Sequence, residues 1–267
     1  GIEADLTISK LNNECFLIVT GAAAATRDFA WLRKNIKDRR AFATDVTAGL
    51  TSLGLMGPKS RDVLQAICDE DLSDNKLPYR SALELEIGYA PVRVVRISYM
   101  GELGYELYIS TEFAQHAFDR IMSEGEACNM QLAGYHAMDS LRLEKGFRHW
   151  GHDIGIEDNP FEAGLSFAID WEADFIGREA LEPLRGGPLT RRLVQFQLNN
   201  PDVYIYHDEP ISRNGVRVGY TTSASFGHTV GASVGMGYIS CYDGVTKNWI
   251  DAGDWTIEVA SEECSAR

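Results

Sequence analysis

Alternating apolar and polar positions occur in short runs through the first half of the chain, with amphipathic helical patterns between them. A period of two residues predicts strands at residues 2–8, 15–20, 52–56, 84–95 and 105–109. Apolar positions three and four residues apart predict helices at residues 28–37, 59–67, 111–125 and 134–146. Because the two kinds of element interleave without the regular period of a doubly wound sheet, the pattern predicts an α+β fold.

The pattern becomes almost purely β beyond residue 188. Short apolar runs predict strands at residues 192–198, 210–213, 216–222, 235–239 and 255–260. Asn214 and Gly215 separate two of these runs and are typical of a type I′ hairpin turn. Short strands joined by such turns predict a small β-barrel or sandwich. We therefore expect an α+β region at residues 1–184 and a C-terminal β-barrel domain at residues 188–267.

Composition limits the kinds of partner that the chain can have. With 267 residues, 45% of them hydrophobic and 24% charged, the chain can bury a substantial core. A formal net charge of −14 argues against nucleic-acid binding. No apolar run approaches the roughly 18 residues that a membrane-spanning helix needs. The five scattered cysteines form no CxxC pair, which is typical of a reducing compartment, either the cytoplasm or the mitochondrial matrix.

The first residues lack an initiator Met and the basic and apolar regions of a signal peptide. We therefore expect the chain to be an N-terminally truncated part of a longer protein.

The most informative stretch is residues 96–109, in which Tyr99 and Glu106 lie seven residues apart around Gly101 and Gly104. A strand, a tight glycine-containing turn and a second strand would bring these groups close together. Tyr99 would stack on a flat ring, Glu106 would accept hydrogen bonds from its N–H groups, and the glycines would let the backbone approach it. An ordinary hairpin with a solvated acid is the alternative interpretation.

Ordered motifs along the chain resemble the glycine-cleavage T-protein (aminomethyltransferase) family of folate-binding proteins. The first reads Tyr-x-Gly-Glu-x-Gly-Tyr-Glu. The matching stretches are residues 99–106, 139–146, 159–165 and 174–181. Within the family, Phe-Arg-His-Trp-Gly-His-Asp at residues 147–153 is most similar to the folate domains of dimethylglycine and sarcosine dehydrogenases. Those are flavoproteins in which the T-protein-like unit is C-terminal.

This resemblance implies three domains in a ring with folate in the central opening, and it implies that Tyr99 and Glu106 bind the folate. The chain would supply part of the first two domains and all of the third. Asp5 matches the catalytic acid in the family's Gly-Ile-x-x-Asp-Leu segment. A carboxylate there would hold and polarise the folate amine that attacks a one-carbon iminium. Apart from the motif, a lone Asp near a strand is usually a surface residue.

Two positions depart from the family pattern. Gly21 lies in the stretch that matches a Val-Asn-Ala segment of the T-proteins, and Met138 stands where they usually carry an Arg that contacts folate. The missing guanidinium indicates a different mode of tail binding or choice of substrate, and it favours the dehydrogenase-linked branch.

An anionic folate tail also calls for a local basic patch in so acidic a chain. One candidate is the basic cluster on the first predicted helix, and a solvated helix face is the alternative interpretation. The cluster comprises Arg33, Lys34, Lys37, Arg39 and Arg40.

Other motifs do not add a cofactor site. His149, His152 and Asp153 lie close in sequence, but Gly151 and the lack of a third strong ligand pattern favour structural hydrogen bonding, and we assign no metal. Residues 231–237 are glycine-rich but lack the GxGxxG spacing and following helix of a dinucleotide loop. Any FAD would belong to an upstream domain. No cysteine has an activating constellation, so we assign none to catalysis.

We expect a tetrahydrofolate-dependent enzyme domain that forms methylenetetrahydrofolate from an iminium or aminomethyl donor. The donor would derive from a small N-methyl amine, oxidised by an attached dimethylglycine or sarcosine dehydrogenase-like flavoprotein. One alternative is a free-standing aminomethyltransferase of the glycine cleavage system, which would take its aminomethyl group from a lipoyl carrier protein. A second is a non-catalytic folate-binding or regulatory module, and a third is a folate demethylase acting on a sulfonium or methoxy donor.

Overall fold

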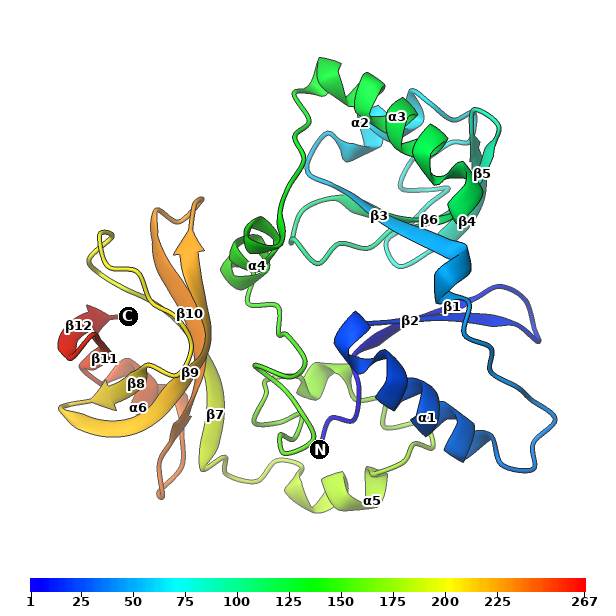
Figure 1. The fold of residues 1–267 in the computed structure, drawn as a ribbon. Coiled ribbons are helices and arrows are strands. Elements are labelled where there is room, and N and C mark those ends of the chain that lie inside the picture. The colour runs from blue at the N-terminus through cyan, green and yellow to red at the C-terminus, as the bar shows by residue number, and fades with distance from the viewer. The chain divides into compact units, whose positions relative to one another are not determined.

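The computed structural model describes all residues, 1–267, and divides them into two compact units (Figure 1). We call them the N-terminal unit (Leu6–Gly134) and the C-terminal unit (Gly1–Asp5 with Tyr135–Arg267). The sequence predicted a boundary between two domains at residues 184–188. The two compact units do not test that boundary, and it stays a prediction. No helix of the structure is both long and apolar enough to span a membrane.

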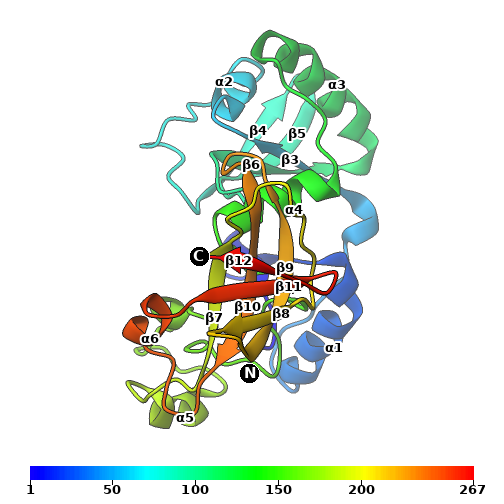
Figure 2. The ribbon, with the colours of Figure 1, turned by 90° about the vertical axis from the view of Figure 1, so that its left-hand side faces the viewer.

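The N-terminal unit contains two antiparallel sheets, one of two strands (β1-β2) and one of four in the order β3-β6-β5-β4. Its elements are β1 (Leu6–Lys10), β2 (Phe16–Thr20), α1 (Ala25–Ile36), β3 (Leu50–Met56), α2 (Ser60–Gln65), β4 (Ala82–Ile87), β5 (Ala90–Val95), β6 (Gly104–Ser110) and α3 (Ala114–Gly125). Helices α2 and α3 pack on the larger sheet (Figure 2), where Leu64 and Ile121 join the core formed by its strands.

The two faces of β6 differ, as the period of two requires. Tyr105, Leu107 and Ile109 are buried in the core beneath α2 and α3. Glu106 and Tyr108 therefore lie on the opposite face of the sheet. Glu106, the residue predicted to bind folate, is thus on the side of the sheet that faces away from this core.

The prediction of one strand at residues 84–95 is wrong, because β4 and β5 form a hairpin there. Ile87 pairs with Ala90 around a two-residue turn in which Gly88 has φ +63°. Because only two residues separate the strands, the alternation of apolar and polar residues continues across the turn. In the sequence, β4 and β5 therefore look like one long strand. The connection from β5 to β6 is also a loop of residues 96–103 and not the expected tight turn.

The C-terminal unit is built on a six-stranded antiparallel sheet in the order β12-β11-β8-β9-β10-β7. Its elements are α4 (Tyr135–Glu144), α5 (Arg178–Leu181), β7 (Arg191–Gln197), β8 (Pro210–Arg213), β9 (Val216–Gly227), β10 (Ala232–Ser240), α6 (Lys247–Asp251), β11 (Trp255–Val259) and β12 (Glu262–Ala266). Gln197 and Arg267 exchange backbone hydrogen bonds of 2.9 Å, and Leu198 forms a bridge with Ala266. These bonds join the two edge strands at one end, as closure of a small barrel requires.

Helix α4 is fixed against this sheet by hydrogen bonds from both sides. Ser140 Oγ donates to the Phe226 carbonyl at 2.6 Å, and Gln195 Nε2 donates to the Leu143 carbonyl at 2.6 Å. The residues that follow α4 therefore start from a fixed position beside β9 and β10. The predicted Asn214-Gly215 turn is confirmed between β8 and β9, with φ values of +51° and +75°.

Candidate functional site

Glu106 is held on β6 by its neighbour two residues along the same face. The Tyr108 hydroxyl donates a hydrogen bond to Glu106 Oε2, and the Tyr108 side chain is buried. Burial raises the pKa of the Tyr108 hydroxyl, and the hydrogen bond to Glu106 raises it further, so Tyr108 stays a donor. Gly54 of β3 lies directly opposite Glu106 and presents no side chain to it. The half-buried carboxylate therefore has a fixed orientation, and the Met56 side chain lies over Gly54 beside it.

Tyr99 is half-buried in the loop that joins β5 to β6. Val95 at the end of β5 pairs with Glu106, so this loop begins and ends at the part of the sheet that carries Glu106. Gly101 has φ +76°, which the loop itself requires. A Cβ on Gly104 would lie 2.1 Å from Met56 Sδ, so packing within the unit accounts for that glycine. The sequence interpretation that the glycines make room for a ligand is thus not needed to explain either one.

Asp5 belongs to the C-terminal unit because its segment binds the turn after α4. We call residues 149–155 the histidine loop. Ile2 N donates to the Gly155 carbonyl at 3.0 Å, and Trp150 Nε1 donates to the Ile2 carbonyl at 3.0 Å. Asp5 is exposed by surface area, yet nearby atoms displace enough water to raise the pKa of its carboxyl. Attraction to His149 opposes this rise, so the carboxyl and the imidazole interact.

A buried ionic network fixes the histidine loop. Arg142 Nη1 donates to Asp153 Oδ2 at 2.6 Å, and Thr222 Oγ1 of β9 donates to Asp153 Oδ1. The same carboxylate accepts from the backbone N–H of His149 at 2.9 Å. Asp153 therefore forms structural hydrogen bonds, the interpretation that the sequence favoured. No group of three or more His, Cys, Asp or Glu side chains is arranged to hold a metal ion.

His149 and His152 lie beside each other in this loop, with ring centroids 4.7 Å apart. Burial lowers the pKa of His149, and the neighbouring His152 and Arg142 lower it further. Asp139 and Asp153 oppose the shift. The His149 ring is therefore favoured in its neutral form, which can accept a proton.

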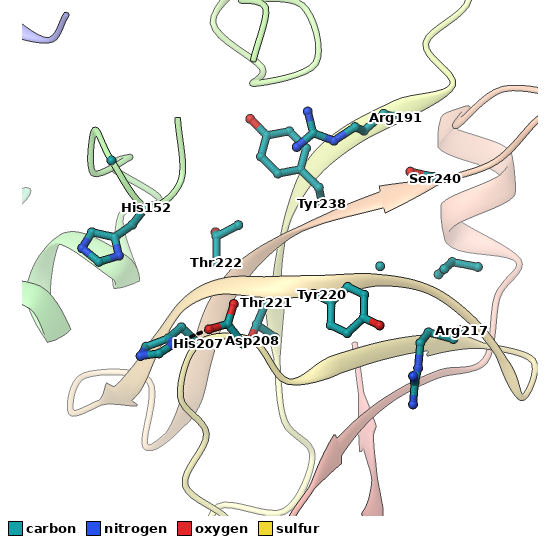
Figure 3. Close-up of a pocket in the computed structure, with 13 residues that line it drawn as sticks. His152, Arg191, His207, Asp208, Arg217, Tyr220, Thr221, Thr222, Tyr238 and Ser240 are labelled. Atoms are coloured by element: carbon teal, nitrogen blue, oxygen red, sulfur yellow. Dashed lines mark hydrogen bonds and ion pairs between the residues drawn. The ribbon is translucent and has the colours of Figure 1, made fainter. Parts of the chain in front are cut away.

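An open groove of about 890 Å³ lies on the C-terminal unit beside this pair (Figure 3). In the close-up, His152 and Arg217 mark opposite ends of the groove, and β9 and β10 carry most of its wall. Its side chains are mainly hydroxyl-bearing, cationic or imidazole groups. The lining residues are Gly151, His152, Arg191, His207, Asp208, Arg217, Val218, Gly219, Tyr220, Thr221, Thr222, Tyr238 and Ser240.

The cations of the groove already have acidic partners. Arg191 Nη1 lies 2.7 Å from Asp158 and 3.4 Å from Glu162, and its guanidinium stacks 3.6 Å above the Tyr238 ring. Arg217 Nη2 lies 3.3 Å from Glu258, and the His207 ring is hydrogen-bonded to Asp208 at 2.7 Å. The groove is thus polar with little excess positive charge. No sequence motif pointed to it, because its residues come from strands far apart in the chain.

The basic cluster expected on the first helix is only partly helical. Arg33 and Lys34 lie in the last turn of α1, which ends at Ile36, and Lys37, Arg39 and Arg40 follow it. All five side chains are exposed, as the alternative of a solvated face requires. Their role toward a folate tail stays a prediction.

Residues 1–173 match the family model of the GCVT N-terminal domain, and residues 191–267 match that of the glycine cleavage T-protein C-terminal barrel domain. The crystal structure of the glycine cleavage system aminomethyltransferase T from Bartonella henselae superposes on all of this chain with a TM-score of 0.82. The two are 28% identical, and the match covers 70% of that protein.

Two longer proteins are also similar to the chain. The 4-methylaminobutanoate oxidase (formaldehyde-forming) of Paenarthrobacter nicotinovorans is 43% identical over 88% of the chain and 29% of its own length. Human mitochondrial dimethylglycine dehydrogenase is 37% identical over 89% of the chain and 28% of its own length. The chain thus spans less than a third of each. These matches confirm the resemblance inferred from the motifs and the α+β fold with a C-terminal barrel domain.

Proposed function

Because the chain belongs to the glycine cleavage T-protein family, we propose that it transfers a one-carbon unit from a nitrogen donor to tetrahydrofolate and forms methylenetetrahydrofolate. Family membership makes folate-dependent aminomethyl transfer its class of function. The observation that carries the specific proposal is the Glu106 carboxylate, oriented by the Tyr108 hydroxyl on the face of the sheet opposite the core.

We assign Glu106 and Tyr99 to the pterin. The Tyr108 hydroxyl engages Oε2 of Glu106, so Oε1 is the oxygen that ring N–H groups of the pterin would meet. Charge-assisted hydrogen bonds of this kind are stronger than bonds between neutral groups. Tyr99 supplies a flat aromatic face from the neighbouring loop, and such a face suits stacking on a heteroaromatic ring.

We assign Asp5 to the reacting amine of the folate. A carboxylate beside a nitrogen that becomes positively charged stabilises the transition state more than the ground state. The raised pKa of Asp5 also favours proton exchange with the nitrogen over a permanent ion pair.

FAD does not fit this chain. The glycine-rich residues 231–237 run directly from a turn into β10, and no helix follows them to place its N-terminus at a pyrophosphate. If the activity includes amine oxidation, the flavin is bound outside this chain.

The donor we propose is the iminium formed by oxidation of a small N-methyl amine. The names of the similar oxidase and dehydrogenase, which act on 4-methylaminobutanoate and dimethylglycine, support this class. An aminomethyl group on a lipoyl carrier is the second candidate, favoured by the full-chain match to an aminomethyltransferase. We propose a reducing compartment, the cytoplasm or the mitochondrial matrix, as the location.

The test is to incubate the whole protein with tetrahydrofolate and each donor in turn. Sarcosine, dimethylglycine and 4-methylaminobutanoate are supplied with an electron acceptor, and aminomethylated lipoyl carrier is supplied alone. Methylenetetrahydrofolate formed only with an N-methyl amine supports the first donor class, and formation only with the carrier supports the second. Tight folate binding without product from any donor would leave a binding or regulatory module and contradict the proposal.

A further inference from the structure

Both polar backbone groups of Ile2 are hydrogen-bonded to the histidine loop. The Ile2 N–H donates to the Gly155 carbonyl at 3.0 Å, and the Ile2 carbonyl accepts from the Trp150 indole N–H at 3.0 Å. Gly155 has no side chain, so Trp150 is the side chain through which the loop holds the Gly1–Asp5 segment. An indole N–H can only donate, and here it donates to this segment and not to its own loop.

Gly1 sets the register of the segment on the chain that follows the loop. A Cβ on Gly1 would lie 1.7 Å from the Ile156 carbonyl oxygen, so only glycine lets the two backbones come this close. A shift of the segment by one residue would bring Ile2 to this point, where its side chain does not fit. The close contact of Gly1 and the two hydrogen bonds of Ile2 therefore fix both the place and the register of the segment.

The part of the loop that carries Trp150 is itself held in place. The buried Asp153 carboxylate, bonded to side chains of α4 and β9, accepts from the N–H of His149 at 2.9 Å. On the other side of Trp150, the Gly151 N–H donates to the Ile154 carbonyl at 2.8 Å. The half-buried indole thus extends from a fixed backbone, and the bond it makes to Ile2 transmits that fixed position to the segment.

The anchor at Ile2 restricts where the Asp5 carboxylate can lie. Asp5 comes three residues after Ile2, a distance of about 10 Å even in a fully extended backbone. Because Asp5 is exposed by surface area, packing around its own side chain does little to hold it. A group that stabilises a developing charge has to stay at a defined place, and a displacement of about 1 Å can slow a reaction by up to about a hundredfold.

We propose that Trp150 is a positioning residue for Asp5, because its indole N–H holds the Ile2 carbonyl and thereby keeps the Asp5 carboxylate at the reacting nitrogen of the folate. The inference rests on the proposed function, in which Asp5 is the acid at that nitrogen. Trp150 acts through the Gly1–Asp5 segment and contacts neither the folate nor the donor. The alternative is that its hydrogen bond only stabilises the C-terminal unit.

The first test measures turnover and tetrahydrofolate affinity of the whole protein with the amine that supports product formation. Trp150→Phe keeps an aromatic ring and removes the N–H, and Gly1→Ala disturbs the same anchor at its other contact. Trp171→Phe is the matched control, because Trp171 is a half-buried indole of the same unit whose ring stacks on Phe161. Each variant is also made in an Asp5→Asn background. Thermal unfolding checks that all variants fold, and rates are corrected for the reaction without protein.

We expect Trp150→Phe and Gly1→Ala to lower kcat by about tenfold while the Kd of tetrahydrofolate stays within a few-fold of wild type. Trp171→Phe should match the wild type. In the Asp5→Asn background, Trp150→Phe should cause no further loss, because the charge that it positions is already absent.

Two outcomes of this test overturn the inference. One is a folded Trp150→Phe that turns over at the wild-type rate. The other is a loss in Trp150→Phe that persists undiminished in the Asp5→Asn background, because Trp150 would then act independently of Asp5, as a merely stabilising residue does.

A second measurement tests the anchor without any turnover. Hydrogen-exchange mass spectrometry follows a peptide that contains Gly1–Asp5 and the Ile2 N–H that is bonded to Gly155. Exchange of this N–H should be at least about tenfold faster in Trp150→Phe than in the wild type, and unchanged in Trp171→Phe. Unchanged exchange in Trp150→Phe overturns the inference and leaves the proposed function in place. If the wild type forms no methylenetetrahydrofolate with any donor, the proposed function fails and the inference falls with it.

Discussion

The Arg142 guanidinium donates to the Asp153 carboxylate at 2.6 Å, with Arg142 only 1% and Asp153 0% exposed to solvent. Without Asp153 the buried Arg142 would keep only Asp139, 2.7 Å from its Nε, and the His149 N–H and the Thr222 hydroxyl would lose their shared acceptor. We predict that Asp153→Ala lowers the free energy of unfolding by about 3–5 kcal/mol. Urea unfolding measures this change.

The matched control is a surface pair of the same unit. Arg178 Nε and Glu182 lie 3.3 Å apart, with Glu182 exposed and Arg178 half-exposed, so Glu182→Ala should change the free energy of unfolding by less than about 1 kcal/mol. Equal effects of Asp153→Ala and Glu182→Ala would mean that the network does not stabilise the histidine loop.

Glu106→Gln should weaken tetrahydrofolate binding by roughly ten- to a hundredfold, since a hydrogen bond to a charged group contributes on the order of 1.5–3 kcal/mol. The amide keeps the size of the side chain and loses its charge, so the unit should stay folded. Calorimetry with tetrahydrofolate measures the affinity. Glu84→Gln is the control, because Glu84 is an exposed residue of the same sheet that pairs with Arg93. Unchanged affinity in Glu106→Gln would remove this residue from the site.

The predicted strands and helices are mostly confirmed because periodicity is a local property of the chain. Periodicity failed around Gly88, where the alternation of apolar and polar residues in β4 continues into β5. It also did not predict β12. The turn before β12 places Ala260 and Ser261 at φ +50° and +69°. These residue types rarely adopt such angles, so the usual Gly or Asn signal of a hairpin was lacking.

The residues of the candidate site also fall into two groups, those that the sequence identified and those that it did not. Asp5, Tyr99 and Glu106 were named from ordered motifs, which a single sequence can display. The partners that hold the site together were not, because Thr222 meets Asp153 only after the barrel folds. Gly151 made His149 and His152 look unsuited to a shared helix, but the loop brings their rings together by a turn.

Asp5→Asn should affect turnover more than binding. We predict folate affinity within a few-fold of wild type and product formation lower by on the order of a hundredfold or more. Asparagine keeps the size and hydrogen bonding of the side chain while losing the charge that stabilises a developing ammonium. Glu3→Gln, an exposed acid of the same segment, is the control.

Amine oxidation with an artificial acceptor gives a second readout where the whole protein carries that activity. It should be nearly unchanged in Asp5→Asn, because we place that chemistry outside this chain. Full coupled activity in the variant would contradict the catalytic role, and loss of both activities would indicate general damage.

Cys68 should resist alkylation. Burial raises the pKa of its thiol from the usual 9.0 to about 11, and Glu70 and Asp69 add to the effect. The thiolate fraction at about pH 8 is then roughly a hundredfold smaller than for an ordinary thiol, and the thiolate is the reactive form. Iodoacetamide labelling followed by mass spectrometry should find Cys15, which is exposed, modified well before Cys68. Equal labelling rates would contradict the burial of Cys68.

The pH dependence of stability should reveal His149. Its folded-state pKa lies below the usual 6.5, so the unfolded chain binds a proton more readily than the folded one in acid. The stabilising contribution is therefore complete above about pH 6.5 and is lost as pH falls through the folded pKa. We predict that acidification from about pH 7.5 destabilises the wild type more than His149→Asn.

Urea unfolding at a series of pH values measures this difference. His136→Asn provides the comparison for an exposed imidazole, and its stability should run parallel to that of the wild type. The charges that oppose protonation are His152 and Arg142, whereas Asp139 and Asp153 favour it. If the wild-type and His149→Asn curves stayed parallel down to about pH 5, burial and the two cations would not outweigh the aspartates. The folded structure would then leave the pKa of His149 where the unfolded chain has it.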